Sequence, residues 1–465
     1  MTSRLYLLSA AEGRRSVKAG EISVVEWVKS SAERIEEVDP SIHVWAYLDI
    51  EKAVSEARAI DRRLAKKEAV GSLCGAPVGV KDIFNTRDMP TCMGSPIWEG
   101  FTPGNDARVV FYLRQADAVI PGKTVTAEFA VHTPGRTVNP HNFGYSPGTS
   151  SSGSAAAVAS FMVPLAVGTQ TAGSIIRPAS YCGVYGYKPS FGLIPRTGTL
   201  KTTDSLDTVG MFARTPDDLE LLFDAVRVHG DNFPISKTFL EDPARQTKKN
   251  RPWKVGLATS SLWVWSRAEE YAREALLKFA SKLSESGVIV EEAKMPEDFD
   301  RAHEIHGTIY DKTLAHYFKE EFKKRTLISE IMYEIIRRGN RITLEEYTLA
   351  LERQNRLARK LGHFFEENGY DVLLTLSTSG QAPRLGGEDK PDSCLIWTLC
   401  GAPAINVPVF RSLYNLPFGA QIVARRYHDF LLLNFARFLQ RAGFVSEDPG
   451  PASCQKTAPS GEVPV

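Results

Sequence analysis

The sequence predicts an α/β fold, and three observations carry this prediction. Residues 75–230 alternate short apolar runs, the length of buried strands, with helical stretches. The alternation returns at Trp253–Leu257 (strand), Ala268–Ser286 (amphipathic helix) and Gly287–Val290 (strand), and Asp371–Leu376 has the pattern of a further buried strand. With 465 residues, 43% of them hydrophobic and 24% charged, the chain has the composition of a globular protein with a large core.

The segments outside this alternation are predicted to be helices and connections. The N-terminal part carries one helix across Glu26–Ile35, which Asp39-Pro40 is expected to stop, and a charged amphipathic helix from Ile50 to Lys66. The polar, Pro-punctuated run Asp231–Arg251 predicts a surface connection.

Long charged helices are predicted to follow through Glu367, and Thr343-Leu-Glu-Glu matches a capping box at a helix start. The C-terminal stretch Glu447–Val465 is rich in Pro, Ser and Gly, which predicts a disordered tail.

Charge and cysteine usage exclude several classes of function. The net charge is +1, from 56 basic and 55 acidic residues, so nothing indicates the clustered basic face of a nucleic-acid partner. The six cysteines are scattered without a Cys-x-x-Cys pair, and no Asn-x-Ser/Thr sequon occurs, which favours a reduced, cytoplasmic setting. No apolar run approaches the ~20 residues of a membrane span, and the N-terminus makes a poor signal peptide. We therefore expect no membrane partner.

Two Ser/Gly-rich loops carry the chemistry of the sequence. Ser146–Ala159 and Gly168–Ala179 flank a segment, Ala155–Val167, that is too apolar for a flexible linker. The second loop runs directly into Tyr181–Pro189, an aromatic stretch with the character of packed core. Serines in such loops supply nucleophiles or proton relays, and Gly-rich turns expose backbone N–H groups.

Both loops resemble the signature of the amidase signature family of serine hydrolases. Further motifs of that family follow in order along the chain: Pro77–Ile83, Ser205–Gly210, Ala213–Asp218, Trp397–Pro408 and Leu416–Ile422. The resemblance implies a large mixed β-sheet core with helices on both faces. It also implies one amidase domain over 1–446, divided into peripheral helices (1–66), a signature core (67–230), a divergent substrate-shaping stretch (231–375) and a C-terminal core (376–446), followed by the tail 447–465.

The resemblance also implies a Ser–Ser–Lys triad. Carried over to this chain, Ser174 is the nucleophile, Ser150 the bridging serine that relays its proton, and Lys81 the base; the spacing of the two serines matches the family motif. A lysine acts as a base only when neutral, so its pKa must fall well below the ordinary value of about 10.4. The apolar residues around Lys81 are suited to bury it.

Other site residues follow from the same motifs. The backbone N–H groups of Thr171-Ala-Gly-Ser174 would form the oxyanion hole, with Ala172 in place of the usual glycine, which is tolerated at negative φ. Ser151 would either hold the triad or cap the helix that follows. In the family a cis peptide bond precedes the bridging serine; here it would be Thr149–Ser150, with Thr149 in place of the commoner glycine.

Arg177 and Gln170 are the substrate-binding candidates. The order Ser174-Ile-Ile-Arg177, with Gln170 before it, resembles the malonamidase-like branch, in which the arginine meets a substrate carboxylate. A guanidinium suits bidentate carboxylate binding. The alternative is a structural arginine paired with a core carboxylate, and the sequence leaves both open.

The sequence contains two misleading motifs. Gly122-Lys-Thr124 lacks the first glycine of a phosphate-binding loop, and His303-Glu-Ile-His306 is one residue shorter than the zinc-protease motif. We therefore expect no cofactor and no metal.

The leading hypothesis is a metal-independent serine amidohydrolase acting on a small-molecule carboxamide, with a homodimer left open. The alternatives are an amide-forming acyl transferase that uses the same acyl-enzyme, a glutaminase subunit of a tRNA-dependent amidotransferase, and a catalytically inactive binding protein. The intact set of Lys81, Ser150 and Ser174 argues against the last.

Overall fold

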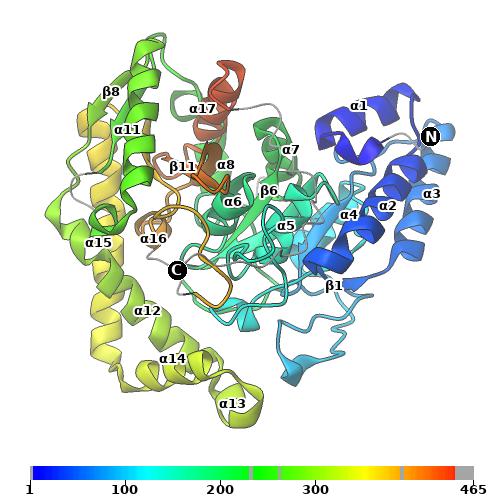
Figure 1. Ribbon diagram of the computed structural model, residues 1–465, viewed down its shortest axis with the longest axis horizontal. Helices are drawn as coiled ribbons and strands as arrows, with labels where there is room; N and C mark the ends of the chain where they lie inside the picture. The colour runs from blue at the N-terminus through cyan, green and yellow to red at the C-terminus, as the bar shows by residue number, and fades with distance from the viewer. Residues whose placement is uncertain (1–3, 230–233, 260–262, 388–391, 446–465) are drawn as a thin grey trace, which may run out of the picture.

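An eleven-stranded mixed sheet runs through the molecule (Figure 1). The computed structural model describes residues 4–229, 234–259, 263–387 and 392–445. From one edge to the other the strands are β1 (Trp45–Leu48), β3 (Gly122–Thr124), β2 (Val78–Lys81), β4 (Leu165–Gln170), β6 (Thr208–Ala213), β5 (Tyr185–Lys188), β10 (Ala404–Arg411), β11 (Pro417–Val423), β9 (Val372–Leu376), β7 (Lys254–Leu257) and β8 (Ile289–Glu292). This single sheet supports one domain over 1–446, which stays a prediction.

Helices cover both faces of the sheet, as predicted. They are α1 (Ala10–Ala19), α2 (Val24–Ile42), α3 (Ile50–Ala65), α4 (Arg108–Gln115), α5 (Ser152–Ala159), α6 (Ile176–Cys182), α7 (Pro216–Val226), α8 (Pro234–Glu241), α9 (Pro243–Gln246), α10 (Trp263–Arg267), α11 (Glu270–Glu285), α12 (Ala302–Tyr317), α13 (Lys319–Phe322), α14 (Glu330–Arg341), α15 (Leu344–Asn368), α16 (Leu395–Leu399) and α17 (Asp429–Arg441). Short 3-10 turns lie at Leu5–Leu7, Pro96–Trp98, Glu128–Ala130, Glu297–Arg301 and Arg325–Leu327.

Strand β4 shows how the two faces arise. Leu165 and Val167 belong to the apolar cluster that contains α7 and α17, whereas Ala166 belongs to the cluster that contains α5, residues of α6 and the C-terminal half of α2. Alternate side chains of a strand point to opposite faces, so one buried strand holds two helical layers. The signature segment α5–β4–α6 is therefore packed from both sides.

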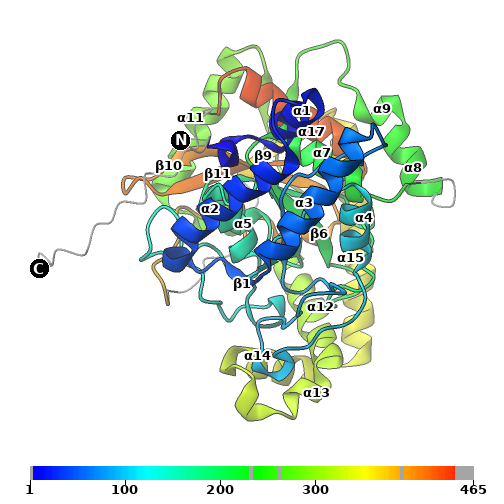
Figure 2. The same ribbon diagram turned by 90° about the vertical axis from the view of Figure 1, so that its right-hand side faces the viewer.

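Helices α12, α14 and α15 lie beside the sheet, coloured from yellow-green to yellow in Figure 1; in Figure 2 α14 is at the bottom, with α12 and α15 above it. Buried residues of α12 and α15 form a third apolar cluster with α16 and Leu373 of β9, whereas those of α14 belong to the large cluster that contains α7 and α17. The divergent stretch is thereby packed against the C-terminal core.

Two predicted boundaries differ from the structure. Helix α2 does not stop at Asp39-Pro40 but continues to Ile42. Pro40 lies in the last turn, where its missing N–H costs a single hydrogen bond, and His43 ends the helix with a left-handed φ of 59°. The strand expected at Gly287–Val290 begins two residues later, because Gly287 makes a left-handed turn after α11.

The predicted connection Asp231–Arg251 contains the helices α8 and α9. Its prolines fall at helix starts, where a residue without an N–H is tolerated, so they initiate helices there instead of breaking them. The capping box at Thr343 is confirmed at the start of α15. The predicted tail 447–465 lies outside the described residues.

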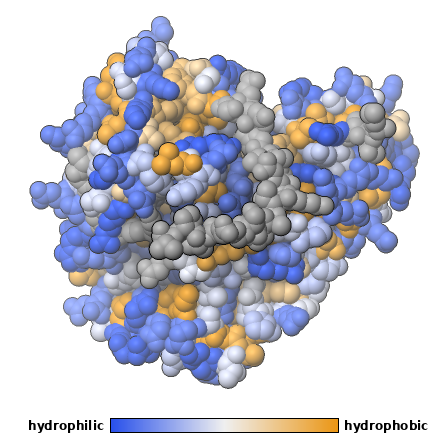
Figure 3. Space-filling model, in the orientation of Figure 1, coloured by the Kyte–Doolittle hydropathy of each residue, from blue (hydrophilic) through white to orange (hydrophobic). Residues whose placement is uncertain are grey.

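The outer surface is mixed in character. On the face drawn in Figure 3, hydrophilic residues dominate and hydrophobic ones form separate groups. Across the described ranges, the helices lack the combination of length and hydropathy that a bilayer crossing requires.

Candidate active site

The predicted triad residues lie at one edge of the central sheet. Lys81 is the last residue of β2, Ser150 precedes α5, and Ser174 lies between β4 and α6. Strands β2 and β4 are parallel neighbours, so their carboxyl ends meet at the same edge. This is where α/β proteins usually place ligands.

Lys81 is fully buried among hydroxyl groups. Its Nζ lies 2.6 Å from Ser150 Oγ, 3.0 Å from Ser151 Oγ and 3.1 Å from Thr169 Oγ1. Burial holds the pKa of this lysine well below its ordinary value, and the nearby charge of Asp207 opposes the shift only in part. The lysine thus meets the requirement for a base, because its surroundings favour the neutral amine.

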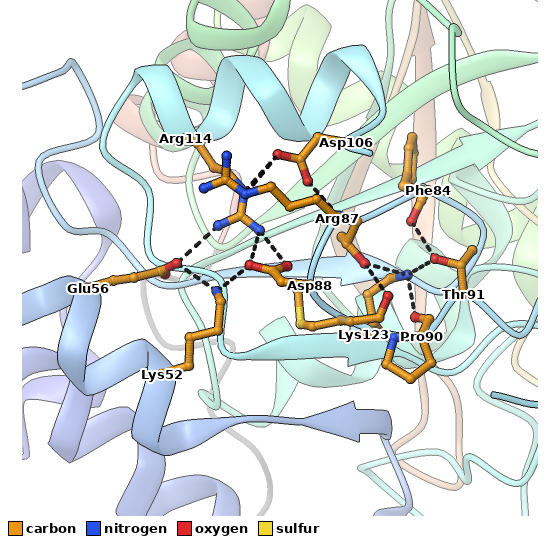
Figure 4. A network of polar contacts seen from close by, with 12 residues as sticks. Lys52, Glu56, Phe84, Arg87, Asp88, Pro90, Thr91, Asp106, Arg114 and Lys123 are labelled. Atoms are coloured by element: carbon orange, nitrogen blue, oxygen red, sulfur yellow. Dashed lines mark hydrogen bonds and ion pairs between the residues drawn. The ribbon is translucent and has the colours of Figure 1, made fainter. Parts of the chain in front are cut away.

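The neighbouring buried lysine shows the contrast. Lys123, on β3, lies 3.2 Å from a carboxylate oxygen of Asp82 and donates to Thr91 Oγ1 at 2.8 Å and to Pro90 O at 3.0 Å. Figure 4 shows this ammonium pointing toward Thr91 and Pro90. Burial lowers its pKa too, but Asp82 in direct contact works against that shift. The side-chain partners of Lys81 are hydroxyl groups, whereas Lys123 contacts a carboxylate in addition to a hydroxyl.

The segment between these two lysines is held by ion pairs. Arg114 pairs with Asp88 at 2.8 Å and with Glu56 at 3.0 Å, and Lys52 pairs with the same two carboxylates (Figure 4). These groups are half-buried, so the pairs are less screened than surface ones. They tie α3 and α4 to the loop that follows Lys81.

Ser150 and Ser151 are placed by different contacts. Thr126 Oγ1 donates to Ser150 O at 2.9 Å, which fixes the backbone of the bridging serine. Ser151 occupies the N-cap position of α5, yet its hydroxyl makes no cap and instead donates to Thr169 O at 3.2 Å. Ser151 was expected either to hold the triad or to cap the following helix. Its hydroxyl contacts Lys81 and does not cap α5.

The prediction of a cis peptide bond at Thr149–Ser150 is wrong. None of the peptide bonds in the described ranges is cis, so this one is trans. The trans form is the lower in energy by about 2.5–4 kcal/mol for a non-proline residue.

The loop Thr171–Ser174 presents backbone donors, as expected for an oxyanion hole. Within the described chain, the N–H groups of Ala172, Gly173 and Ser174 donate to no other group, and neither does the Ser174 hydroxyl. Ala172 does not have a left-handed φ, so it fits where the family has glycine. Thr171 Oγ1 donates to Asp207 Oδ1 at 2.8 Å, which anchors the start of the loop.

Gln170, predicted to bind substrate, has both ends of its side-chain amide paired within the protein. The side chain is fully buried, and its Oε1 accepts from the N–H groups of Ile175 and Ile176 at 2.8 and 3.0 Å. Its Nε2 donates to Thr398 Oγ1 at 2.9 Å. The amide therefore supports the backbone that carries the nucleophile.

Arg177 is paired with a carboxylate of the protein. Its Nε and Nη2 donate to the two oxygens of Asp392 at 2.8 and 2.6 Å, and its Nη1 donates to Thr149 Oγ1 at 3.0 Å. The side chain is only 4% exposed. A bidentate partner already occupies the planar fork, which favours the structural alternative over a clamp for an acidic substrate.

A cavity of about 210 Å³ borders the site. Thr169 and Thr171 line it, and so join it to the surroundings of Lys81 and to the nucleophile loop; the lining further includes Ile83, Ala130, Arg196, Thr199, Leu200, Lys201, Thr202, Asp207, Thr208 and Val209. Its size is suited to a small molecule.

Sequence reasoning missed Thr169, Asp207 and Asp392. Thr169 and Asp207 lie inside the signature motifs, so their position was the available signal. Asp392 lies outside those motifs in a Gly- and Asp-rich stretch, where nothing in the sequence marks it as the partner of Arg177. Lys123, in the misleading Gly122-Lys-Thr124 motif, lies on strand β3.

Comparison with known proteins fits this geometry. The chain matches the family model named Amidase over residues 26–433. It is 44% identical over 247 residues to the glutamyl-tRNA(Gln) amidotransferase A-subunit of Acidothermus cellulolyticus, a match that covers 52% of this chain and 48% of that protein. The chain thus spans about half the length of that relative. The protein of the same name from Streptomyces avermitilis is 32% identical over 473 residues, covering 91% of this chain and 92% of that protein.

The fold is shared with a solved amidase. The peptide amidase from Stenotrophomonas maltophilia superposes with a TM-score of 0.80 at 25% identity, covering 94% of this chain and 97% of that one. Family model, relatives and fold agree with the lysine and serine motifs, and the chain belongs to the amidase signature family.

Proposed function

We propose that this protein hydrolyses the C–N bond of a small carboxamide through an acyl-enzyme on Ser174. The observation that carries the proposal is the 2.6 Å contact between the buried Lys81 Nζ and Ser150 Oγ. A lysine whose neutral form is favoured by burial, in contact with a serine hydroxyl, is suited to accept a proton as a base. The Lys81 base and the backbone donors account for the chemistry without a metal.

The hydroxyl contacts fix where the lone pair of Lys81 points. A neutral amine has two N–H donors and one lone pair. The proton of Ser151 is already given to Thr169 O, so Ser151 Oγ accepts from Lys81. With Thr169 Oγ1 as the second acceptor, the lone pair is left for the proton of Ser150.

The proposed reaction moves one proton out and back. Ser150 passes its proton to Lys81 and takes that of Ser174, whose Oγ attacks the carbonyl carbon. The oxyanion is stabilised by the free N–H groups of the loop Thr171–Ser174. As the C–N bond breaks, the proton returns through Ser150 to the leaving nitrogen, and water then hydrolyses the ester by the same relay. Catalytic contacts of this kind tighten when substrate binds, so Ser174 needs no hydrogen bond beforehand.

Labelling with a fluorophosphonate tests this proposal. The wild-type protein should be modified at Ser174, located by peptide mass spectrometry, and should release ammonia from members of a panel of neutral and acidic carboxamides. Addition of an amine acceptor separates hydrolysis from acyl transfer, because a transferase would form the new amide instead of the acid.

Arg177 provides a test of the substrate class. Arg177→Ala leaves the largely buried carboxylate of Asp392 without its partner, which should lower the free energy of unfolding by about 3–5 kcal/mol. We expect kcat/KM to fall by the same factor for malonamic acid and for propionamide, because the fork holds Asp392 and not the substrate. The double variant Arg177→Met, Asp392→Asn removes both charges and should recover much of the stability. A loss confined to malonamic acid would show that Arg177 binds a substrate carboxylate.

The amidotransferase relatives favour a second candidate function, that of a glutaminase subunit. In this case the same acyl-enzyme would form on L-glutamine, and a partner protein would use the ammonia. The protein alone and together with the other amidotransferase components from its own genome should be assayed for glutamate release. Turnover of L-glutamine only in the assembled complex would replace the leading proposal, whereas turnover of simple amides by the isolated chain would support it.

A further inference from the structure

The loop that carries the nucleophile is held by its carbonyl groups. His306 Nε2 donates to Thr171 O at 2.9 Å, and Thr398 Oγ1 donates to Ala172 O at 2.8 Å. The next carbonyl, that of Gly173, accepts from the main-chain N–H of Arg177 at 2.9 Å. Three successive carbonyls of the loop thus each accept a hydrogen bond.

The peptide plane converts these contacts into a direction for the N–H groups. In a trans peptide the C=O of one residue and the N–H of the next are rigid and point in opposite directions. A carbonyl of Thr171 fixed by His306 aims the N–H of Ala172 away from His306. A carbonyl of Ala172 fixed by Thr398 does the same for the N–H of Gly173. These are N–H groups that donate to nothing else in the described chain.

We infer that His306 and Thr398 are positioning residues that orient the oxyanion-hole N–H groups of Ala172 and Gly173. The inference rests on the proposed function, because it concerns the residues that orient the oxyanion-hole loop of the proposed active site. Neither side chain touches the reacting atoms; each acts through a peptide group.

Both residues are built for such a role. His306 is 4% exposed on α12, and its ring stacks on Tyr310 with centroids 5.6 Å apart and planes at 21°. Thr398, on α16, is 1% exposed and is itself held by Gln170 Nε2. Burial keeps water from competing for the two carbonyls, and the stack and the Gln170 contact limit the rotamers.

The role of His306 is unexpected from sequence. His303-Glu-Ile-His306 has the character of a solvated helix face or a failed metal motif, and it lies in the divergent stretch. Among the described residues no group of histidine, cysteine and acidic side chains is arranged to hold a metal. The structure gives His306 a partner in the nucleophile loop instead.

The test measures phosphonylation of Ser174, in which charge develops on an oxygen bound by the oxyanion hole. The probe is a fluorophosphonate, and kinact and KI are determined separately. His306→Phe keeps a ring against Tyr310 but removes the donor to Thr171 O. It should lower kinact by about 10- to 100-fold with KI unchanged, less than the 10²–10³ in rate that loss of an oxyanion-hole donor itself typically costs, because His306 only orients such a donor. His306→Gln retains a side-chain N–H and should restore most of kinact. His316→Phe, the same change at an exposed position of α12, is the matched control and should react like wild type.

The possible outcomes distinguish failure of the proposed function from failure of the inference about His306 and Thr398. Absence of Ser174 labelling in the wild type would overturn the proposed function and this inference with it. Labelling of the wild type with unchanged kinact in His306→Phe, or an equal loss in His306→Phe and His306→Gln, would overturn this inference alone. If His306→Phe does not fold, Thr398→Val, which removes the hydroxyl at constant shape, is compared with Thr398→Ser, which keeps it; equal kinact in this pair would also overturn it.

Discussion

Ser174→Ala is expected to abolish fluorophosphonate labelling and to lower amide turnover by at least about 10⁴-fold, because the members of a catalytic triad act as a unit. Within the described residues the Ser174 hydroxyl makes no hydrogen bond, and its backbone N–H belongs to the donor loop. Loss of the hydroxyl removes the atom that forms the acyl-enzyme, while the fold around α6 keeps its contacts. Labelling and the release of ammonia from the amide panel are the measurements.

Ser152→Ala is the matched control for this change. Ser152 lies in the other signature loop, is 2% exposed, and has a hydroxyl without a hydrogen-bond partner in the described structure. Its removal should leave both labelling and turnover near the wild-type values. If Ser174→Ala retained wild-type turnover, or if Ser152→Ala lost it to the same extent, the assignment of the nucleophile would be wrong.

Local motifs account for the predicted proximity of Lys81 and Ser150, which the structure places 2.6 Å apart, whereas the roles of the triad residues stay predictions. Lys81 ends a strand and Ser150 and Ser174 occupy loops next to two short helices, so each motif sets its own backbone. The sheet then brings the loops together through the parallel pairing of β2 and β4. The family motifs therefore carry information on both the local backbone and the pairing of the strands. The predicted burial of Lys81 is confirmed.

The partners of these residues were not predictable in the same way. Asp392 in the C-terminal core lies far along the chain from Arg177, and His306 in the divergent stretch lies far from Thr171, so both contacts depend on how these parts pack against the signature core. A motif shows that Arg177 needs an anion but does not show whether the anion is a substrate or another residue. Gln170 is a similar case, because the motif shows an amide next to the serine loop but does not show that its hydrogen-bond partners lie within the protein.

Lys81→Met is the second change with a large expected effect. Methionine keeps the length of the side chain and removes the amine, so turnover should fall about as far as in Ser174→Ala. In the wild type, kcat/KM should rise with pH through the depressed pKa of Lys81 and hold toward alkaline pH, because only the neutral amine accepts the proton.

Lys188→Met tests whether any buried lysine produces this profile. Lys188 is also fully buried, and burial lowers its pKa to about 7, yet its Nζ donates to the backbone carbonyl of Ala402 and not to a serine. Its variant should retain the pH profile.

Lys81→Met also has an expected effect on the free energy of unfolding, which can be measured without any substrate. Between the depressed pKa of Lys81 and its ordinary value of 10.5, the lysine is neutral when folded and protonated when unfolded, so unfolding takes up a proton. The free energy of unfolding of the wild type should therefore rise with pH relative to Lys81→Met, by about 1.4 kcal/mol per pH unit within that window, and the difference should be constant above it. Lys188 contributes equally to both proteins and cancels in the comparison. Denaturant unfolding of the two proteins at several alkaline pH values measures the slope. A difference independent of pH would mean that Lys81 keeps its proton in the folded protein, and a protonated lysine is not the base that the proposed relay needs.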